Sequence, residues 1–190
     1  GTFAGLGKQG YEVMGFHGGL ELGGGSVIVA WAATSITPMT LDQLETPLLL
    51  LDRVRLARNL ARMRDKLAPH GVALRPHVKT AKSVDVVRLA VAPGAGGITV
   101  STLKEAEQFF AAGYRDILYA VGIAPNKLDH VTALRLSGCD LTVILDNIEA
   151  ARAVAGRGVP ALIEIDSDGH RAGVKPGDAR LLEIGRVLGR

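Results

Sequence analysis

The chain alternates between short runs of apolar residues and longer stretches in which apolar residues recur every three or four positions. The first pattern is typical of buried strands and the second of amphipathic helices. From residue 46 onward the apolar runs predict strands at 47–51, 72–78, 97–101, 116–121, 141–145 and 161–165. The helical spacing between and after them predicts helices at 53–67, 83–92, 103–112, 125–136, 147–155 and 180–190.

Residues that suit helix ends stand beside several of these segments. Asp52 and Ser83 can accept hydrogen bonds from the N–H groups of the helix that follows each, and Pro125 suits a first helical turn. Glycine suits the left-handed residue that ends many helices, and three glycines follow predicted helices: Gly113, Gly138 and Gly156.

The fold class follows from strands that are apolar throughout and separated by helices. Such strands form a parallel sheet covered by helices, which leaves a doubly wound α/β sheet or a (β/α)₈ TIM barrel. No glycine-rich phosphate-binding turn follows an early strand, and this favours the barrel. The sequence therefore predicts a partial barrel that contains the strands from 72–78 onward.

The two ends of the chain differ from this pattern. Residues 1–38 are rich in glycine and are predicted to be a separate leader, or sequence upstream of a start at Met39, before barrel residues 39–190. Residues 5–10 match G-x-G-x-x-G, but no strand precedes them and no helical pattern follows, so a dinucleotide site is disfavoured. The helix at 180–190 stops on an unfinished pattern, which predicts a fragment.

Composition narrows the partners and the compartment. The chain has 22 Lys and Arg against 19 Asp and Glu, a net charge of +3, and the scattering of the basic residues argues against nucleic acid. Cys139 is the single cysteine, so no intrachain disulfide can form and a cytoplasmic location is expected. The apolar run at 27–33 is far shorter than the roughly 20 residues of a membrane span, so no membrane partner is expected.

One candidate for chemistry is the lysine at the end of the strand predicted at 72–78. Strand alternation places the side chains of Arg75, His77 and Lys79 on one face of the strand. If Lys79 points into the mouth of the barrel, the other two side chains point there as well. A lysine held there beside other cationic groups can supply a neutral amine for a Schiff base. A lysine that only extends into solvent from a strand end gives the same pattern, so periodicity alone does not separate the two interpretations.

A second candidate is the polar loop after the strand predicted at 161–165. Arg171 can donate a fixed pair of hydrogen bonds to an anionic oxygen, with Asp166 or Asp168 orienting it. Alternatively, Asp168 and the glycine after it form a turn, and Arg171 pairs with a neighbouring acid. A metal site is disfavoured because His170 and Asp168 are only two residues apart in a loop.

Five segments carry a resemblance to one family: Leu44-Glu45-Thr46-Pro47 with the strand ending at Asp52, Asn59 with Met63, Arg75-Pro76-His77-Val78-Lys79-Thr80, residues 102–106 and residues 164–174. Through them the chain, from about Leu44 to its end, resembles the D-serine dehydratase and D-threonine aldolase family. That family is part of the alanine racemase-like, fold-type III pyridoxal phosphate enzymes.

The resemblance implies roles for four residues. It implies that Lys79 holds pyridoxal 5'-phosphate as an internal aldimine and that His77 belongs to the cofactor site. Arg171 is similar to the arginine that approaches the phenolic oxygen of the cofactor, and Ser101 matches a strand-end position near that oxygen. Ala81 stands where many members have histidine, which blurs the substrate subclass.

The implied activity is that of a lyase for D-β-hydroxy amino acids, through D-serine dehydration or D-threonine aldol cleavage. An amino-acid racemase and a non-catalytic pyridoxal phosphate-binding protein are the alternatives. The substrate is a small D-amino acid, and members of this type can be homodimers.

The resemblance also places several family features beyond Arg190. They are the phosphate-binding loop, a cofactor-facing tyrosine and the divalent metal site, for Zn²⁺ or Mn²⁺, of a C-terminal β domain. No metal is therefore expected within this chain. The strand at 47–51 normally belongs to that β domain, so it is expected to be unpaired here.

Overall fold

The computed structural model describes residues 11–13 and 50–189, and it divides into two compact units, Gly1–His70 and Gly71–Arg190. In the first unit, β1 (Tyr11–Val13) pairs with β2 (Leu50–Asp52), followed by α1 (Arg53–Leu67) and the 3₁₀ turn η2 (Ala68–His70). The predicted boundary between residues 38 and 39 lies outside the described residues.

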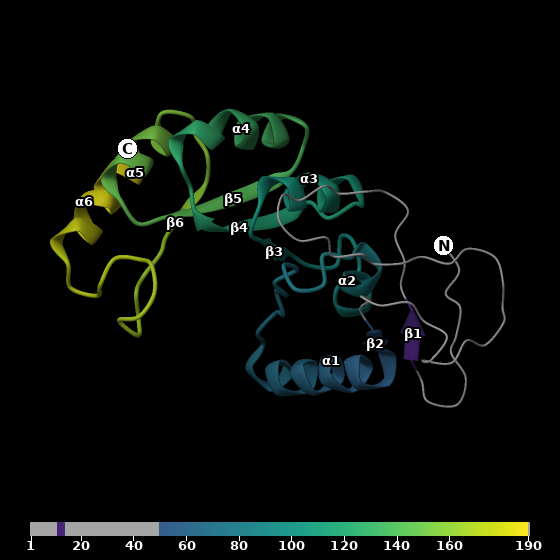
Figure 1. The fold of residues 1–190 in the computed structure, drawn as a ribbon. Helices are drawn as coiled ribbons and strands as arrows, with labels where there is room; N and C mark the ends of the chain where they lie inside the picture. The colour runs from purple at the N-terminus through teal and green to yellow at the C-terminus, as the bar shows by residue number, and fades with distance from the viewer. Residues whose placement is uncertain (1–10, 14–49, 190) are drawn as a thin grey trace. The chain divides into compact units, whose positions relative to one another are not determined.

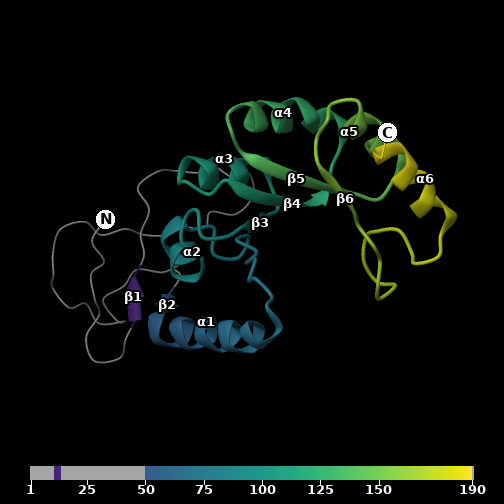
Figure 2. The ribbon, with the colours of Figure 1, turned by 180° about the vertical axis from the view of Figure 1, so that it is seen from behind.

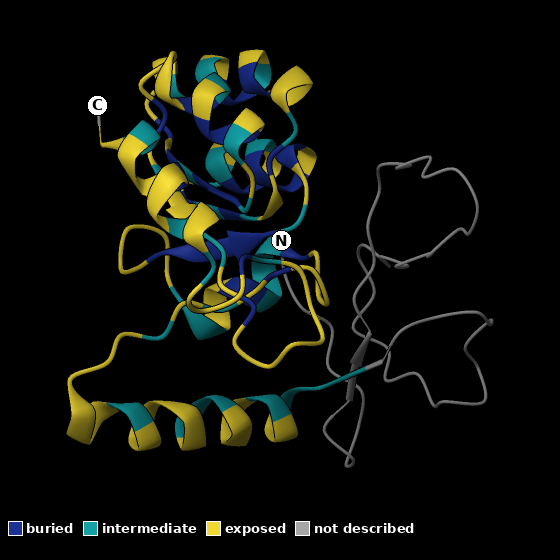
Figure 3. Cartoon of the chain, turned by 90° about the vertical axis from the view of Figure 1, so that its left-hand side faces the viewer, coloured by how far each residue is buried: buried dark blue, intermediate teal, exposed yellow. Residues whose placement is uncertain are grey.

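The first helix begins where its cap predicts. The backbone N–H of Arg55 donates to Asp52 Oδ1 at 2.8 Å, so the aspartate satisfies one of the free N–H groups of the first turn. No residue of α1 is buried, as Figure 3 shows. The expectation of an unpaired first strand is wrong, because β2 pairs antiparallel with β1.

The second unit is a four-stranded parallel sheet with helices between its strands (Figure 1). The strands are β3 (Ile98–Val100), β4 (Asp116–Gly122), β5 (Asp140–Leu145) and β6 (Ala161–Ile163), in the spatial order β3-β4-β5-β6. The helices are α2 (Val84–Ala90), α3 (Leu103–Ala111), η3 (Pro125–Lys127), α4 (Leu128–Leu136), α5 (Ile148–Ala155) and α6 (Ala179–Leu188).

The strand order decides between the two architectures that the sequence left open. A doubly wound sheet reverses its strand order at a switch point, whereas here each strand pairs with the next strand in the chain. Right-handed crossovers then place the connecting helices on one side of the sheet, where Figures 1 and 2 show α3, α4 and α5. The strand order and the one-sided helices therefore favour the partial barrel over the doubly wound sheet.

Burial alternates along β4, whereas every residue of β3 is buried. In β4, Ile117 and Tyr119 are fully buried, whereas Leu118 between them is partly exposed. The core lies between the sheet and its helices, where the dark blue of Figure 3 is concentrated. Tyr114 closes one side of it, because its hydroxyl donates to the carbonyl of Val91 at 2.8 Å.

The strand predicted at 72–78 is absent. Only one bridge forms, between His77 and Thr99, with Thr99 N–H donating to the Pro76 carbonyl and Val78 N–H donating to the Thr99 carbonyl, both at 2.9 Å. Proline has no N–H to donate, so the ladder does not continue through Pro76.

The predicted helix ends are mostly confirmed. Ser83 caps α2, Pro125 starts η3, and Gly113 and Gly138 have φ values of 96° and 95°. The prediction for Gly156 is wrong, since its φ is −62° and the left-handed residue after α5 is Gly158. No helix in residues 50–189 is long and apolar enough to cross a membrane.

Candidate active site

Lys79 stands on a turn directly after the bridge between His77 and Thr99. The Lys82 N–H donates to the Val78 carbonyl at 2.8 Å, which closes a loop over residues 79–82. The side chain of Lys79 is exposed. The segment that carries it touches the sheet by a single bridge beside β3, which leaves the turn in solvent.

The structure brings His77 and Ser101 together although they are 24 residues apart. His77 Nε2 and Ser101 Oγ are 3.3 Å apart, and the backbone N–H of Lys79 donates to His77 Nδ1 at 3.3 Å. Because Nδ1 accepts, the ring proton is assigned to Nε2, which donates to Ser101. The hydroxyl proton of Ser101 then remains available for a ligand.

The charge state of His77 agrees with this assignment. Burial and the nearby charge of Lys79 lower the pKa of His77 from 6.5, and Glu105 partly opposes them. The imidazole is therefore neutral at pH 7 and can keep one nitrogen as an acceptor.

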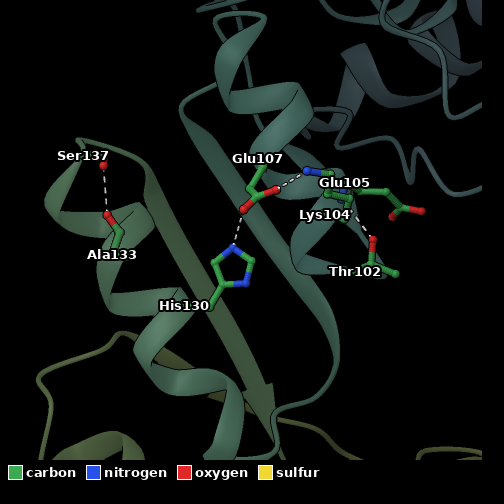
Figure 4. Close-up of polar contacts among 7 residues, drawn as sticks. All are labelled: Thr102, Lys104, Glu105, Glu107, His130, Ala133 and Ser137. Atoms are coloured by element: carbon green, nitrogen blue, oxygen red, sulfur yellow. Dashed lines mark hydrogen bonds and ion pairs between the residues drawn. The ribbon is translucent and has the colours of Figure 1, made fainter. Parts of the chain in front are cut away.

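Glu105 is a member of this cluster that sequence reasoning missed. Its Oε2 accepts the backbone N–H of Ser101 at 2.7 Å, and its Oε1 is 3.4 Å from Lys82 Nζ without forming a hydrogen bond. Its own N–H donates to Thr102 Oγ1 at 3.0 Å (Figure 4). The available signal was the T-x-x-E spacing of residues 102–105, which is a capping box.

Arg171 lies in the loop that follows β6. The buried Asp166 organises this loop, because its Oδ1 accepts the backbone N–H groups of Gly169 at 2.9 Å and Arg171 at 3.4 Å. Asp166 thus orients Arg171 through its backbone, while the Arg171 side chain is exposed. Among residues 50–189, no hydrogen bond or ion pair joins Arg171 to Lys79, His77 or Ser101.

The two polar groups nevertheless share one edge of the sheet. Ser101 follows the end of β3, and the loop at 164–171 follows the end of β6. The carboxyl ends of parallel strands lie at the same edge, which is where barrels carry their sites. This edge offers an amine, a neutral imidazole, a hydroxyl and a guanidinium, which suit a carbonyl compound with anionic oxygens.

Arg75 does not join this edge, so its predicted place beside Lys79 is wrong. Its Nη1 and Nη2 donate to the two carboxylate oxygens of Asp116 at 2.8 and 2.6 Å. Asp116 is the first residue of β4, so Arg75 lies at the opposite edge of the sheet. In the part of the chain that the structure describes, no group of three His, Cys, Asp or Glu side chains could hold a metal ion.

The comparisons with known proteins agree on one family. The family model described as "Alanine racemase, N-terminal domain" matches residues 51–186. D-threo-3-hydroxyaspartate dehydratase of Delftia sp. (strain HT23) is 54% identical over 156 residues, which cover 78% of this chain and 41% of the relative.

Solved structures extend the likeness to the fold. The Delftia dehydratase structure has a TM-score of 0.70 and 54% identity, covering 73% of this chain and 38% of its own. D-threonine aldolase from Filomicrobium marinum has a TM-score of 0.69 and 30% identity, covering 79% of this chain and 42% of its own. The chain spans about two fifths of the length of the curated relatives that it matches.

Proposed function

The chain belongs to the family of the alanine racemase N-terminal domain, and from that premise we propose that the protein is a pyridoxal phosphate-dependent lyase for D-β-hydroxy amino acids. The proposed cofactor-binding residues are Lys79, His77, Ser101 and Arg171, with Lys79 as the catalytic residue. The Delftia dehydratase, a D-serine dehydratase of Dictyostelium discoideum at 35% identity and a D-threonine aldolase of Arthrobacter sp. at 34% support this substrate class.

The observation that carries the proposal is the placing of Lys79 against the end of β3. Its amine is exposed and reachable, while its backbone N–H is tied to His77, which in turn contacts Ser101. These groups fit pyridoxal phosphate: an amine can take the aldehyde, and the Ser101 hydroxyl and the exposed Arg171 can donate to anionic oxygens.

Each residue has a separable task in this scheme. Bound pyridoxal phosphate supplies an aldehyde and a ring that accepts electrons from a substrate. Neutral His77 positions the main chain at Lys79 and directs the Ser101 hydroxyl. Asp166 fixes the loop from which the Arg171 guanidinium extends.

Covalent trapping tests the role of Lys79. The purified protein is incubated with pyridoxal phosphate, reduced with borohydride, digested and mapped by mass spectrometry. We expect a pyridoxyl group on Lys79 that disappears in Lys79→Ala and persists in Lys175→Ala, which removes another exposed lysine of the same unit. Equal labelling of both variants, with unchanged circular dichroism, would contradict the assignment.

Substrate assays test the reaction class. A protein that joins this chain to the C-terminal part found in its relatives is offered D-threo-3-hydroxyaspartate, D-serine and D-threonine. The assay is run with added Mn²⁺ or Zn²⁺ and then with a chelator, because the resemblance implies a metal site in that part. We expect ammonia with a keto acid, or glycine with an aldehyde, and loss of turnover on chelation. Metal-independent exchange of D and L forms would instead indicate a racemase, and cofactor binding without turnover a carrier.

A further inference from the structure

We propose that Glu105 is a positioning residue for the loop that carries Lys79. Its two carboxylate oxygens hold Ser101, at the end of β3, and Lys82, at the end of the loop, in one arrangement. The inference rests on the proposed function, because its consequence is where the Lys79 amine meets the cofactor.

The burial of Glu105 needs an explanation. The residue is only 5% exposed, and glutamate is almost never that buried unless it is paired. Oε2 accepts one hydrogen bond at 2.7 Å, from Ser101, whereas buried Oε1 accepts none and has the Lys82 ammonium 3.4 Å away. Lys82 is therefore the cation that compensates this carboxylate.

The contacts form a closed ring around the loop. Glu105 contacts Ser101, Ser101 contacts His77, and His77 accepts from the backbone of Lys79. Lys82 returns the ring to Glu105. Both ends of the loop at 79–82 are thus tied to the first turn of α3, so a change at Glu105 reaches Lys79 without touching it.

The backbone of Lys82 supports the same conclusion. Its φ of 47° lies in the left-handed region, which residues other than glycine adopt at a cost. Such a conformation persists where the surroundings enforce it. The ion pair with Glu105 and the hydrogen bond from Lys82 N–H to the Val78 carbonyl are the contacts that enforce it here.

Helix capping alone does not account for Glu105. In a capping box the glutamate side chain accepts the N–H of the cap residue, here Thr102. Glu105 Oε2 instead accepts the N–H of Ser101, one residue earlier, and Oε1 lies 3.4 Å from Lys82 Nζ. The Glu105 side chain points away from Glu107, which pairs with Lys104 and His130 on the other side of the helix (Figure 4). A capping role predicts no effect of Lys82, whereas the positioning role does.

The experiment compares charge, strain and position in four variants of the purified protein. Glu105→Gln keeps an oxygen for Ser101 but loses the charge, and Lys82→Gly suits the left-handed backbone but loses the ammonium. Lys82→Arg keeps a cation, and Glu107→Gln is the matched control on the same helix.

Two kinds of readout, with and without the cofactor, separate this inference from the proposed function. Hydrogen exchange of the Lys79 and Lys82 amides and the NMR titration of His77 need no cofactor, whereas pyridoxal phosphate affinity does. We expect each of the variants Glu105→Gln and Lys82→Gly to speed hydrogen exchange of the Lys79 and Lys82 amides about tenfold. We expect each also to weaken the affinity for pyridoxal phosphate about tenfold, because a charge-assisted contact is lost. Glu105→Gln also lowers the pKa of His77, because the carboxylate raises it.

Lys82→Arg and Glu107→Gln should behave like the parent protein in both readouts. Parent-like exchange and His77 titration in Glu105→Gln, or parent-like exchange in Lys82→Gly, would overturn the inference. A parent protein that binds no pyridoxal phosphate at Lys79, with the exchange results as expected, would overturn the proposed function and leave the role of Glu105 in the loop intact.

Discussion

Replacing Gly173 by alanine should release the loop that carries Arg171. Gly173 has a φ of 118°, and an added Cβ would lie 2.6 Å from Asp166 N, 2.8 Å from the Ile165 carbonyl carbon and 2.9 Å from the Glu164 carbonyl oxygen. All three atoms belong to the backbone, so no side chain can rotate to make room. The chain must accept the overlap or separate the two segments.

The cheaper route sets the expected loss of stability. An isolated parallel bridge joins Ile165 to Val174. Keeping this bridge costs about 1–3 kcal/mol for overpacking and about 1–3 kcal/mol for the unfavourable φ. Separation breaks two hydrogen bonds, Asp166 N–H to the Val174 carbonyl at 3.0 Å and Val174 N–H to the Glu164 carbonyl at 2.8 Å. Each of these hydrogen bonds contributes about 0.5–1.5 kcal/mol, so separating the two segments costs less than keeping the bridge. With the disturbed Asp166 loop included, the free energy of unfolding should fall by about 2–3 kcal/mol.

Urea unfolding measures this loss, and hydrogen exchange at the Asp166 and Val174 amides locates it. Gly177→Ala is the matched control, because Gly177 has a φ of 85° and no atom within 4 Å of its added Cβ. The control meets only the backbone cost of about 1–2 kcal/mol. Equal losses in the two variants, or unchanged exchange at Asp166 in Gly173→Ala, would refute the close-approach argument.

Three further outcomes are expected. Gly97→Ala places a Cβ 2.4 Å from Asp116 Oδ2 and against the Arg75 guanidinium, so it should lower the free energy of unfolding by about 1 kcal/mol, and by less in an Arg75→Ala background. Equal losses in the two backgrounds would show that the added Cβ does not displace the Arg75–Asp116 ion pair. Burial is the first cause of the lowered pKa of His77, so the contribution of His77 to stability is present above pH 6.5 and is lost as the pH falls through the folded-state pKa. His77→Gln should remove this pH dependence of the unfolding free energy, and an unchanged dependence would assign it to another group. Burial raises the pKa of the Cys139 thiol from 9.0 to about 11, so alkylation at pH 8 should be roughly a hundredfold slower than in urea, and fast labelling of the folded protein would contradict its burial.

The helices could be predicted from the sequence because capping residues and the spacing of apolar residues are local signals. The helix predicted at 53–67 has those bounds in the structure, because Asp52 supplies a cap and the apolar spacing is regular. The strands at the sheet centre were equally clear, since β5 is buried over almost its whole length. The order of the strands followed from neither pattern, and it is what separates a partial barrel from a doubly wound sheet.

The sequence predictions were wrong where contacts between residues far apart in the chain determine the structure. Alternation placed Arg75 and Lys79 on one face but could not show that Arg75 pairs with Asp116, 41 residues away at the other edge of the sheet. Glu105 was hidden for the same reason: the capping-box spacing predicts a helix start, whereas its contact with Lys82 depends on how the loop folds back. The prediction of a strand at 72–78 was wrong because apolar residues do not replace the N–H that Pro76 lacks for pairing with the next strand.

The sequential order of the strands has a consequence for how the protein acquires its structure. In the four-stranded sheet each strand pairs with the next strand in the chain, so pairing can advance from neighbour to neighbour without waiting for a remote segment. During synthesis the His77–Ser101 contact, which spans 24 residues, can form before the Arg171 loop has left the ribosome. The lysine side of the proposed site can thus form first, and the arginine side is then added to a surface that already exists.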